Sequence, residues 1–145
     1  MGSEDTKRAL MLGFVAGALM VLCIQNAFNQ SSSRPGSNEA WGLFVGLTFK
    51  DDVAKAEFKT LFAPFAEYVE QSEPHTLSYM YMDSDKDPQR GLIVERYLEK
   101  DKAFLVDHKN SQSFLKFREK LKVMQNDGKV KLDGESYQEG IGYMS

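Results

Sequence analysis

Residues 73–117 read EPHTLSYMYMDSDKDPQRGLIVERYLEKDKAFLVDHKNSQSFLKF. The residues after the Glu-Pro pair alternate in the two-residue period of a β-strand, with Leu77, Tyr79 and Tyr81 on one face. A polar segment containing Asp87-Pro88 then predicts a hairpin connection to a second strand. Beyond that strand the apolar residues fall at helical spacing. These residues therefore predict a turn, two paired strands and an amphipathic helical region.

The second strand of this hairpin is expected at residues 91–98, with Ile93, Glu95 and Tyr97 sharing one face. Glu95 would then be a carboxylate in the middle of a largely apolar strand. After this strand, Asp101 is expected to cap a short helix. That helix carries Ala103, Phe104 and His108.

Upstream of residue 73, the chain predicts one strand and one helix. Apolar residues at 41, 43, 45, 47 and 49 alternate as in a strand, and Asp51 or Asp52 can cap the helix that follows. Aromatic residues repeat on one face of that helix. Pro64 lies inside it and removes a backbone donor, so we expect a kink or two abutting helices.

Downstream, Ser111 is expected to cap a helix with Phe114 and Phe117 on its buried face. A closing strand is expected from Gly134 to Met144, with Tyr137, Ile141 and Tyr143. The order strand, helix, strand, strand, helix, strand is the split βαβ arrangement called ferredoxin-like. We therefore expect residues 40–145 to form an α+β sandwich whose helices cover one face of the sheet.

The opposite face of this sheet is also expected to be small or apolar, as Gly42, Phe44 and Gly46 on the first strand indicate. An uncovered apolar face of that size marks an association surface. Two copies packing sheet to sheet would bury it, so we expect a homodimer.

The succession of residues between 73 and 117 resembles the antibiotic biosynthesis monooxygenase (ABM) domain family. The usual family pattern is Glu-Pro-Gly-Thr-Leu-x-Tyr, an Asp-Pro turn, Glu-Arg-Tyr/Trp, then Ala-Phe-x-x-x-His-x-x-Ser-x-x-Phe. His75 stands where the family commonly has Gly, and Ser113 stands where many members carry a second His. The resemblance implies a dimeric α/β barrel. It also implies one of several roles, since members include enzymes that oxygenate quinols and polyketide aromatics with no metal or flavin, others that degrade haem, and others without proven catalysis.

The N-terminal residues differ in composition from the domain. Residues 9–24 carry no charge, and extension to Phe28 gives about twenty residues, the length that crosses a hydrocarbon layer of ~30 Å. We therefore expect residues 1–28 to be a membrane anchor and the turn-forming residues 29–39 to be a flexible linker. Retention of the full-length chain in the membrane pellet after alkaline carbonate extraction tests this expectation.

A cleaved signal peptide is the alternative, but the large residues 21–25 do not offer the small side chains of a cleavage site. Lys7 and Arg8 precede the span and only Arg34 follows it closely. This bias favours an N-terminus in the cytosol and a domain across the membrane.

Composition excludes two classes of site. Lys and Arg total 18 against 21 Asp and Glu, so the chain has no basic excess of the kind that nucleic-acid binding requires. With one cysteine and two histidines in the sequence, neither an intramolecular disulfide nor a structural zinc site is expected.

Two titratable residues are the candidates for catalysis. His108 on the inner side of a helix can take or give a proton near neutral pH; the alternative is a core histidine bonded to backbone. Glu95 can act as a general acid or base with a raised pKa if it is buried; the alternative is an ion pair with Arg96 or with a lysine of a neighbouring strand. We expect Glu95 and His108 to pair and to face one cavity between the sheet and the second helical region.

Four aromatic residues are candidate walls for a flat substrate, although rings at these spacings also form ordinary core. They are Tyr79, Tyr97, Phe104 and Phe114. Together with the resemblance, these residues favour a monooxygenase that needs no cofactor and oxidises a quinol-like or other electron-rich aromatic substrate. The alternative is a non-catalytic dimeric module that binds a small apolar ligand or a partner protein, and the serine at position 113 favours it.

Overall fold

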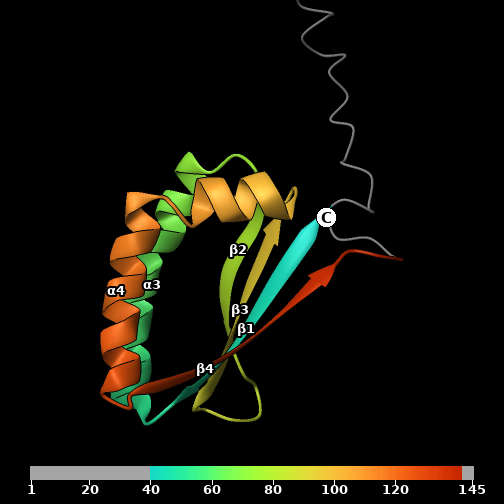
Figure 1. The fold of residues 1–145 in the computed structure, drawn as a ribbon. Coiled ribbons are helices and arrows are strands. Elements are labelled where there is room, and N and C mark those ends of the chain that lie inside the picture. The colour runs from blue at the N-terminus through green and yellow to red at the C-terminus, as the bar shows by residue number, and fades with distance from the viewer. Residues whose placement is uncertain (1–39, 142–145) are drawn as a thin grey trace, which may run out of the picture. The chain divides into compact units, whose positions relative to one another are not determined.

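The structure, a computed structural model, describes residues 40–141 (Figure 1). Its elements follow one another as β1 (Trp41–Phe49), α3 (Asp52–Ser72), β2 (Thr76–Asp83), β3 (Arg90–Tyr97), the π-helix η1 (Lys100–His108), α4 (Gln112–Asn126) and β4 (Val130–Gln138). The four strands form one sheet in the order β2-β3-β1-β4, and every neighbouring pair is antiparallel. Figure 1 shows α3 and α4 side by side on one face of this sheet. The predicted ferredoxin-like α+β fold is confirmed.

Helix α3 forms because its start is capped and one of its faces is apolar. The side chain of Asp51 accepts a hydrogen bond from the backbone N–H of Ala54 at 2.8 Å. Apolar residues at helical spacing on one face are buried: Phe58, Phe62, Phe65 and Val69. They share a core with Leu47 and Phe49 of β1, with β3, β4 and with α4. Burial of each large side chain contributes about 1.5–3 kcal/mol.

Helix α3 passes through Pro64 as one helix, so of the two alternatives expected there, a kink or two abutting helices, the second is wrong. The Pro64 ring lies on the exposed side, while buried aromatic residues precede and follow it. An interior proline costs about 3 kcal/mol. Continuous packing of the apolar face on the sheet offsets that cost.

Strand β2 departs from strict alternation at its start. The register places Thr76 opposite Tyr97 and Ser78 opposite Arg96, so Leu77 is an extra residue in a β-bulge. Leu77 is therefore exposed and does not share the face of Tyr79 and Tyr81, contrary to expectation. The bulge has a second effect, because it turns Thr76 toward the helix-covered side of the sheet.

Two further expectations need correction. Asp101 does not cap the helix after β3: the N-cap is Glu99, which makes no side-chain bond, and the helix is of the π type. The closing strand begins at Val130 rather than at Gly134, because Gly128, with φ of 68°, turns the chain directly into pairing with Phe49. The same strand ends at Gln138, and Ile141 beyond it is exposed.

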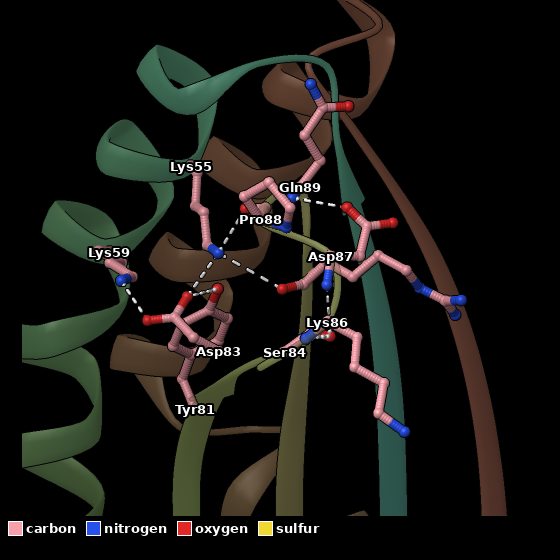
Figure 2. Close-up of polar contacts among 10 residues, drawn as sticks. Lys55, Lys59, Tyr81, Asp83, Ser84, Lys86, Asp87, Pro88 and Gln89 are labelled. Carbon is pink, nitrogen blue, oxygen red and sulfur yellow. Dashed lines mark hydrogen bonds and ion pairs between the residues drawn. The ribbon is translucent and has the colours of Figure 1, made fainter.

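The predicted hairpin connection joins β2 to β3 and is tied to α3 (Figure 2). Asp83 forms ion pairs of 2.6 Å with both Lys55 and Lys59 of α3. Lys55 also donates to the carbonyl oxygen of Pro88 at 2.7 Å, and the Ser84 hydroxyl accepts two backbone N–H groups of the loop. The hydrogen bonds from these lysines hold the pKa of Asp83 well below its usual range. Polar contacts thus fix the end of the hairpin against the start of the first helix.

The face of the sheet that α3 and α4 leave open carries apolar side chains, as expected. Met80, Met82 and Tyr137 are 47%, 41% and 50% exposed on it, and Phe44 packs edge-on against Tyr137 with ring centroids 5.6 Å apart.

Within residues 40–141, none of the helices has the length and apolar character needed to cross a bilayer. The predicted anchor, residues 1–28, and the predicted linker, residues 29–39, lie outside the described residues.

Glycine is required at position 91 by the ring of Tyr81. A Cβ atom added to Gly91 would lie 2.4 Å from two atoms of that ring system, whereas one added to Gly134 meets nothing closer than 3.7 Å. Since the Tyr81 ring packs on Phe58 at 5.4 Å, Gly91→Ala is expected to lower the free energy of unfolding by about 1–3 kcal/mol. Gly134→Ala is the matched control and should stay within about 0.5 kcal/mol. Urea unfolding of both variants measures the difference, and equal stabilities would contradict this account of Gly91.

Candidate active site

The site is built around His108, the last residue of η1. Its side chain is fully buried, and its Nδ1 lies 2.7 Å from Oε2 of Glu73. Glu73 is itself only 6% exposed and follows the last residue of α3. The pair therefore joins the end of the first long helix to the end of the π-helix, inside the protein.

Local structure fixes the Glu73 carboxylate. The backbone N–H of Glu73 donates to the carbonyl of Val69, and the following Pro74 favours the end of the helix here. Thr76, turned inward by the bulge in β2, donates its hydroxyl to Oε2 of Glu73 at 3.0 Å. The same oxygen thus has two partners, His108 and Thr76.

Two buried polar atoms of this pair have no hydrogen-bond partner among the described residues, namely Oε1 of Glu73 and Nε2 of His108. When Nδ1–H donates to the carboxylate, a neutral imidazole keeps a lone pair on Nε2. A carboxylate at one ring nitrogen and a free lone pair at the other is the arrangement that orients a histidine as a general base. Each unpaired buried polar atom costs about 1–3 kcal/mol, so both of these atoms carry that cost.

Aromatic rings surround the imidazole. All four predicted wall residues lie around it, with ring centroids at 4.8 Å (Phe114), 5.3 Å (Tyr97), 5.4 Å (Tyr79) and 6.1 Å (Phe104). Phe65 of α3 is a fifth ring at 5.6 Å. His108 is therefore enclosed by a largely apolar shell.

Glu95 lies in the same region but does not make the expected hydrogen bond to His108. Its Oε2 accepts from the hydroxyl of Tyr97 at 2.7 Å, while His108 is bound to Glu73. The alternative partner, Arg96, is on the other face of β3 and is bonded to Glu139. Burial raises the pKa of Glu95 above its ordinary value, although the Tyr97 hydrogen bond and the His108 charge act against this shift. The predicted carboxyl with a raised pKa is therefore present, with a tyrosine as its partner.

The two tyrosines of the site are held in their neutral form. Burial raises the pKa of Tyr79 well above its usual value, and the charges of Glu95 and Glu73 raise it further. Burial and then Glu95 do the same for the pKa of Tyr97. Both hydroxyls are consequently proton-bearing hydrogen-bond donors at physiological pH.

A pocket lies next to the site, on the side of Glu73. A pocket of about 380 Å³ lies between the end of α3 and η1, and its lining includes Glu73, His75 and Asp107. Neither His108 nor Glu95 lines this pocket. A second pocket, of about 450 Å³, lies on the open face of the sheet beside Phe44 and Tyr137.

The structure brings His108, Glu95 and the four predicted rings into one region, together with Glu73 and Phe65, which the sequence patterns did not single out. Glu73 is the first residue of the stretch that resembles the family pattern, and no role in the site was predicted for it. Its position directly before Pro74 could have indicated a carboxylate that is held in place where the chain reverses. In residues 40–141, no group of three or more acidic, histidine or cysteine side chains is placed to hold a metal ion.

Comparison with protein families gives one match: the family model described as antibiotic biosynthesis monooxygenase matches residues 47–120. Curated proteins gave no significant match.

Several solved structures share this fold. A candidate antibiotic biosynthesis monooxygenase from Caulobacter crescentus has 20% identity, a TM-score of 0.60, and covers 72% of this chain and 92% of its own. A similar protein from Nitrosomonas europaea has 21% identity, a TM-score of 0.57, and coverages of 70% and 90%. SnoaB, a cofactor-independent oxygenase from Streptomyces nogalater, has 14% identity, a TM-score of 0.58, and coverages of 72% and 96%. At these identities the similarity shows a shared fold.

The raised pKa of Glu95 predicts a pH dependence of stability. Above its ordinary value of 4.5, and up to the raised pKa, the folded protein holds a proton on Glu95 that the unfolded chain has lost. The contribution of Glu95 to stability therefore falls as pH rises through this window. Glu95→Gln keeps an acceptor for Tyr97 but does not titrate, so the variant should gain stability relative to the wild type between pH 4.5 and neutrality. Urea unfolding across this range measures the difference, and a difference independent of pH would contradict the assignment.

Proposed function

Because the chain belongs to the antibiotic biosynthesis monooxygenase family, we propose that it is a monooxygenase that oxidises a quinol-like or other electron-rich aromatic substrate without a cofactor. The observation that supports this most strongly is the buried His108, oriented by Glu73 at Nδ1 and unpaired at Nε2 inside a shell of aromatic rings. A reaction without a cofactor needs a substrate that becomes reducing when deprotonated, a base to deprotonate it, and a dry environment.

The first step assigned to these residues is proton removal. Nε2 of His108 accepts the proton of a phenolic hydroxyl, and Glu73 stabilises the imidazolium through Nδ1–H. Because the His108 ring has no exposed surface, this charge interaction is weakly screened. The phenolate that results is a much stronger reductant than the phenol.

Oxygen then reacts with the phenolate. One electron passes to O₂, and the phenoxyl radical and superoxide combine to form a C–O bond at a ring carbon, ortho or para to the hydroxyl, that carries a hydrogen. The proton held by His108 returns to the peroxide. A base removes the C–H proton from that carbon, the O–O bond breaks, and the departing hydroxide takes the proton from the base, which releases water and leaves a carbonyl group. Phenol and O₂ thus give quinone and water, and the substrate supplies all four electrons that reduce O₂.

Glu95 and Tyr97 are the second proton-transfer unit in this proposal. A carboxyl whose pKa is raised by burial is a better proton acceptor when ionised, and it releases its proton nearer to neutral pH. Glu95 is therefore assigned the C–H proton of the second half of the reaction, with Tyr97 as its hydrogen-bond donor.

The predicted N-terminal anchor extends the proposal to a location. An anchor in residues 1–28 would hold the domain beside a membrane, where lipophilic quinols are dissolved. Exposed Met80 and Met82 on the open sheet face suit either an apolar ligand or a second copy of the chain.

A non-catalytic dimeric module is the second candidate function. The closed packing around His108 favours it, since the aromatic rings occupy the space that a substrate would need. In that case the Glu73–His108 pair is a structural link between α3 and η1.

His108→Ala separates these two functions. If His108 is the base, oxygen consumption with a hydroquinone or naphthol should fall by roughly 10²-fold or more, the scale of a general base. The control is Leu115→Ala, which truncates an exposed side chain of α4 and should leave turnover unchanged. Unaltered turnover per folded molecule in His108→Ala, together with a lowered melting temperature, would leave only the structural role.

Homodimer formation through the open sheet face is the accompanying proposal. A double substitution, Met80→Glu with Met82→Glu, places two charges in that face and should convert a dimer into a monomer. Light scattering of the full-length chain in detergent measures the mass. A wild type that is monomeric while folded, or a dimer that survives both substitutions, would contradict this interface.

A further inference from the structure

A groove of about 210 Å³ lies between α3 and α4, which run side by side on one face of the sheet (Figure 1). Its inner part is apolar, because the buried rings of Phe65 and Phe117 line it. Leu61 and Pro64 line it from α3. The function proposed above makes no use of this space, which we call the interhelix groove.

The α4 wall of the interhelix groove is cationic. Lys116 and Lys120 are one helical turn apart, so they lie on the same side of α4, and both line the groove. Both are exposed, and neither forms an ion pair within residues 40–141. The α3 segment that lines the groove, residues 58–66, contains no acidic side chain. Two cations therefore border a groove in which no carboxylate neutralises them.

Ser113 lines the same groove, at the position where many members of the family carry a second histidine. Its hydroxyl makes no hydrogen bond within the part of the chain that the structure describes, so it is available as a donor. Two ammonium groups and a hydroxyl thus lie above an apolar base. This arrangement complements an anionic group that is attached to an apolar body.

The charges of the domain are segregated around this groove. Residues 100–122, which include η1 and most of α4, carry seven cations and three acids, whereas the rest of residues 40–141 carry eight cations and fifteen acids. Of those seven cations only Lys102 forms an ion pair among the described residues, while four of the eight elsewhere do. The surface around the groove is therefore complementary to an extended anionic surface.

We propose that the interhelix groove binds the headgroup of an anionic phospholipid and so docks α4 on the surface of an anionic bilayer. Lys116 and Lys120 bind the phosphate, and Ser113 donates a hydrogen bond to it. Val123, 55% exposed, continues the row of these two lysines along α4 and contacts the apolar part of the bilayer interface. This inference is independent of the monooxygenase reaction.

A bilayer fits this surface better than an acidic protein does. Surfaces that bind a membrane interface combine lysines, which reach the headgroups, with apolar groups that lie deeper, as in this groove. The predicted anchor, residues 1–28, would also hold the domain next to headgroups and raise their effective concentration. Each cation near an anionic bilayer adds to the attraction, so binding should depend steeply on the number of lysines.

The test uses the ¹⁵N-labelled full-length chain with lipid nanodiscs that contain a phosphatidylcholine spin-labelled at its headgroup. One set of discs is phosphatidylcholine alone, and the other also contains phosphatidylserine. The spin label should enhance amide relaxation in residues 113–123 at least tenfold more in the phosphatidylserine discs. Added salt should abolish the difference, because it screens exposed charges. Equal enhancement in both kinds of disc, or enhancement strongest around Phe44 and Tyr137 on the open sheet face, would overturn the proposal.

Matched variants test the face itself. Lys116→Gln with Lys120→Gln should lower the enhancement in phosphatidylserine discs at least tenfold. The control is Lys86→Gln with Lys131→Gln, which removes two exposed lysines that form no ion pair within residues 40–141 and changes the net charge equally. Glu119→Gln removes the acid of α4 and should raise the salt concentration at which the enhancement is lost. Enhancement that survives in the groove variant, or that the control loses equally, would overturn the role of this face.

Soluble anions separate the bilayer from other occupants. Glycerophosphoserine, the same headgroup without acyl chains, should not displace the discs, and displacement would show a site for a free phosphate instead. A poly-glutamate peptide that binds residues 113–123, with no response to phosphatidylserine discs, would assign the face to an acidic protein. Either result would overturn docking on a bilayer.

Discussion

The hydrogen bond between Glu73 and His108 links the two helices α3 and η1 in the interior of the domain. It joins the end of α3 to the end of η1 across 35 positions of sequence, at 2.7 Å and out of contact with water. A buried carboxylate without a partner costs several kcal/mol, so each member of the pair depends on the other. Together with the apolar cluster of Trp41, Tyr97 and Ala103, this contact holds η1 against the sheet.

Two carboxylates and an imidazole share one apolar region, which is unusual in a domain of this size. Glu73 and His108 form a hydrogen bond through one atom of each side chain, and Glu95 accepts a hydrogen bond from Tyr97. Among residues 40–141, the two buried side-chain atoms left without partners are both in the Glu73–His108 pair. Structural pairs are normally completed by further hydrogen bonds, whereas unused acceptors next to a pocket are typical of a site that a ligand completes. This contrast is the physical reason for favouring a binding or catalytic role over a purely structural one.

The periodicity of apolar residues was sufficient for the element order and most element types. Alternation at 41–49 and 91–98 predicted β1 and β3, and helical spacing of aromatic residues predicted α3 and α4. These predictions depend on local geometry, in which side chains repeat every two or every 3.6 residues whatever the rest of the chain does. The motif-like stretch at 73–117 likewise identified the family, because it preserves residue types at fixed spacing.

Local pattern could not establish which titratable groups meet. Glu95 and His108 were expected to pair because both lie on inward faces. In the structure, the bulge at Leu77 turns Thr76 inward, where its hydroxyl binds the Glu73 carboxylate. The chain reversal at Pro74 completes this placement, so Glu73 rather than Glu95 binds the imidazole. The same limit applies to Pro64, where packing across the whole sheet outweighed a local helix-breaking preference. The residue sequence determined the strands, helices and candidate side chains through short-range periodicity. Partner choice among buried charges was determined by the tertiary structure, because it depends on distances between segments that only the folded core brings together.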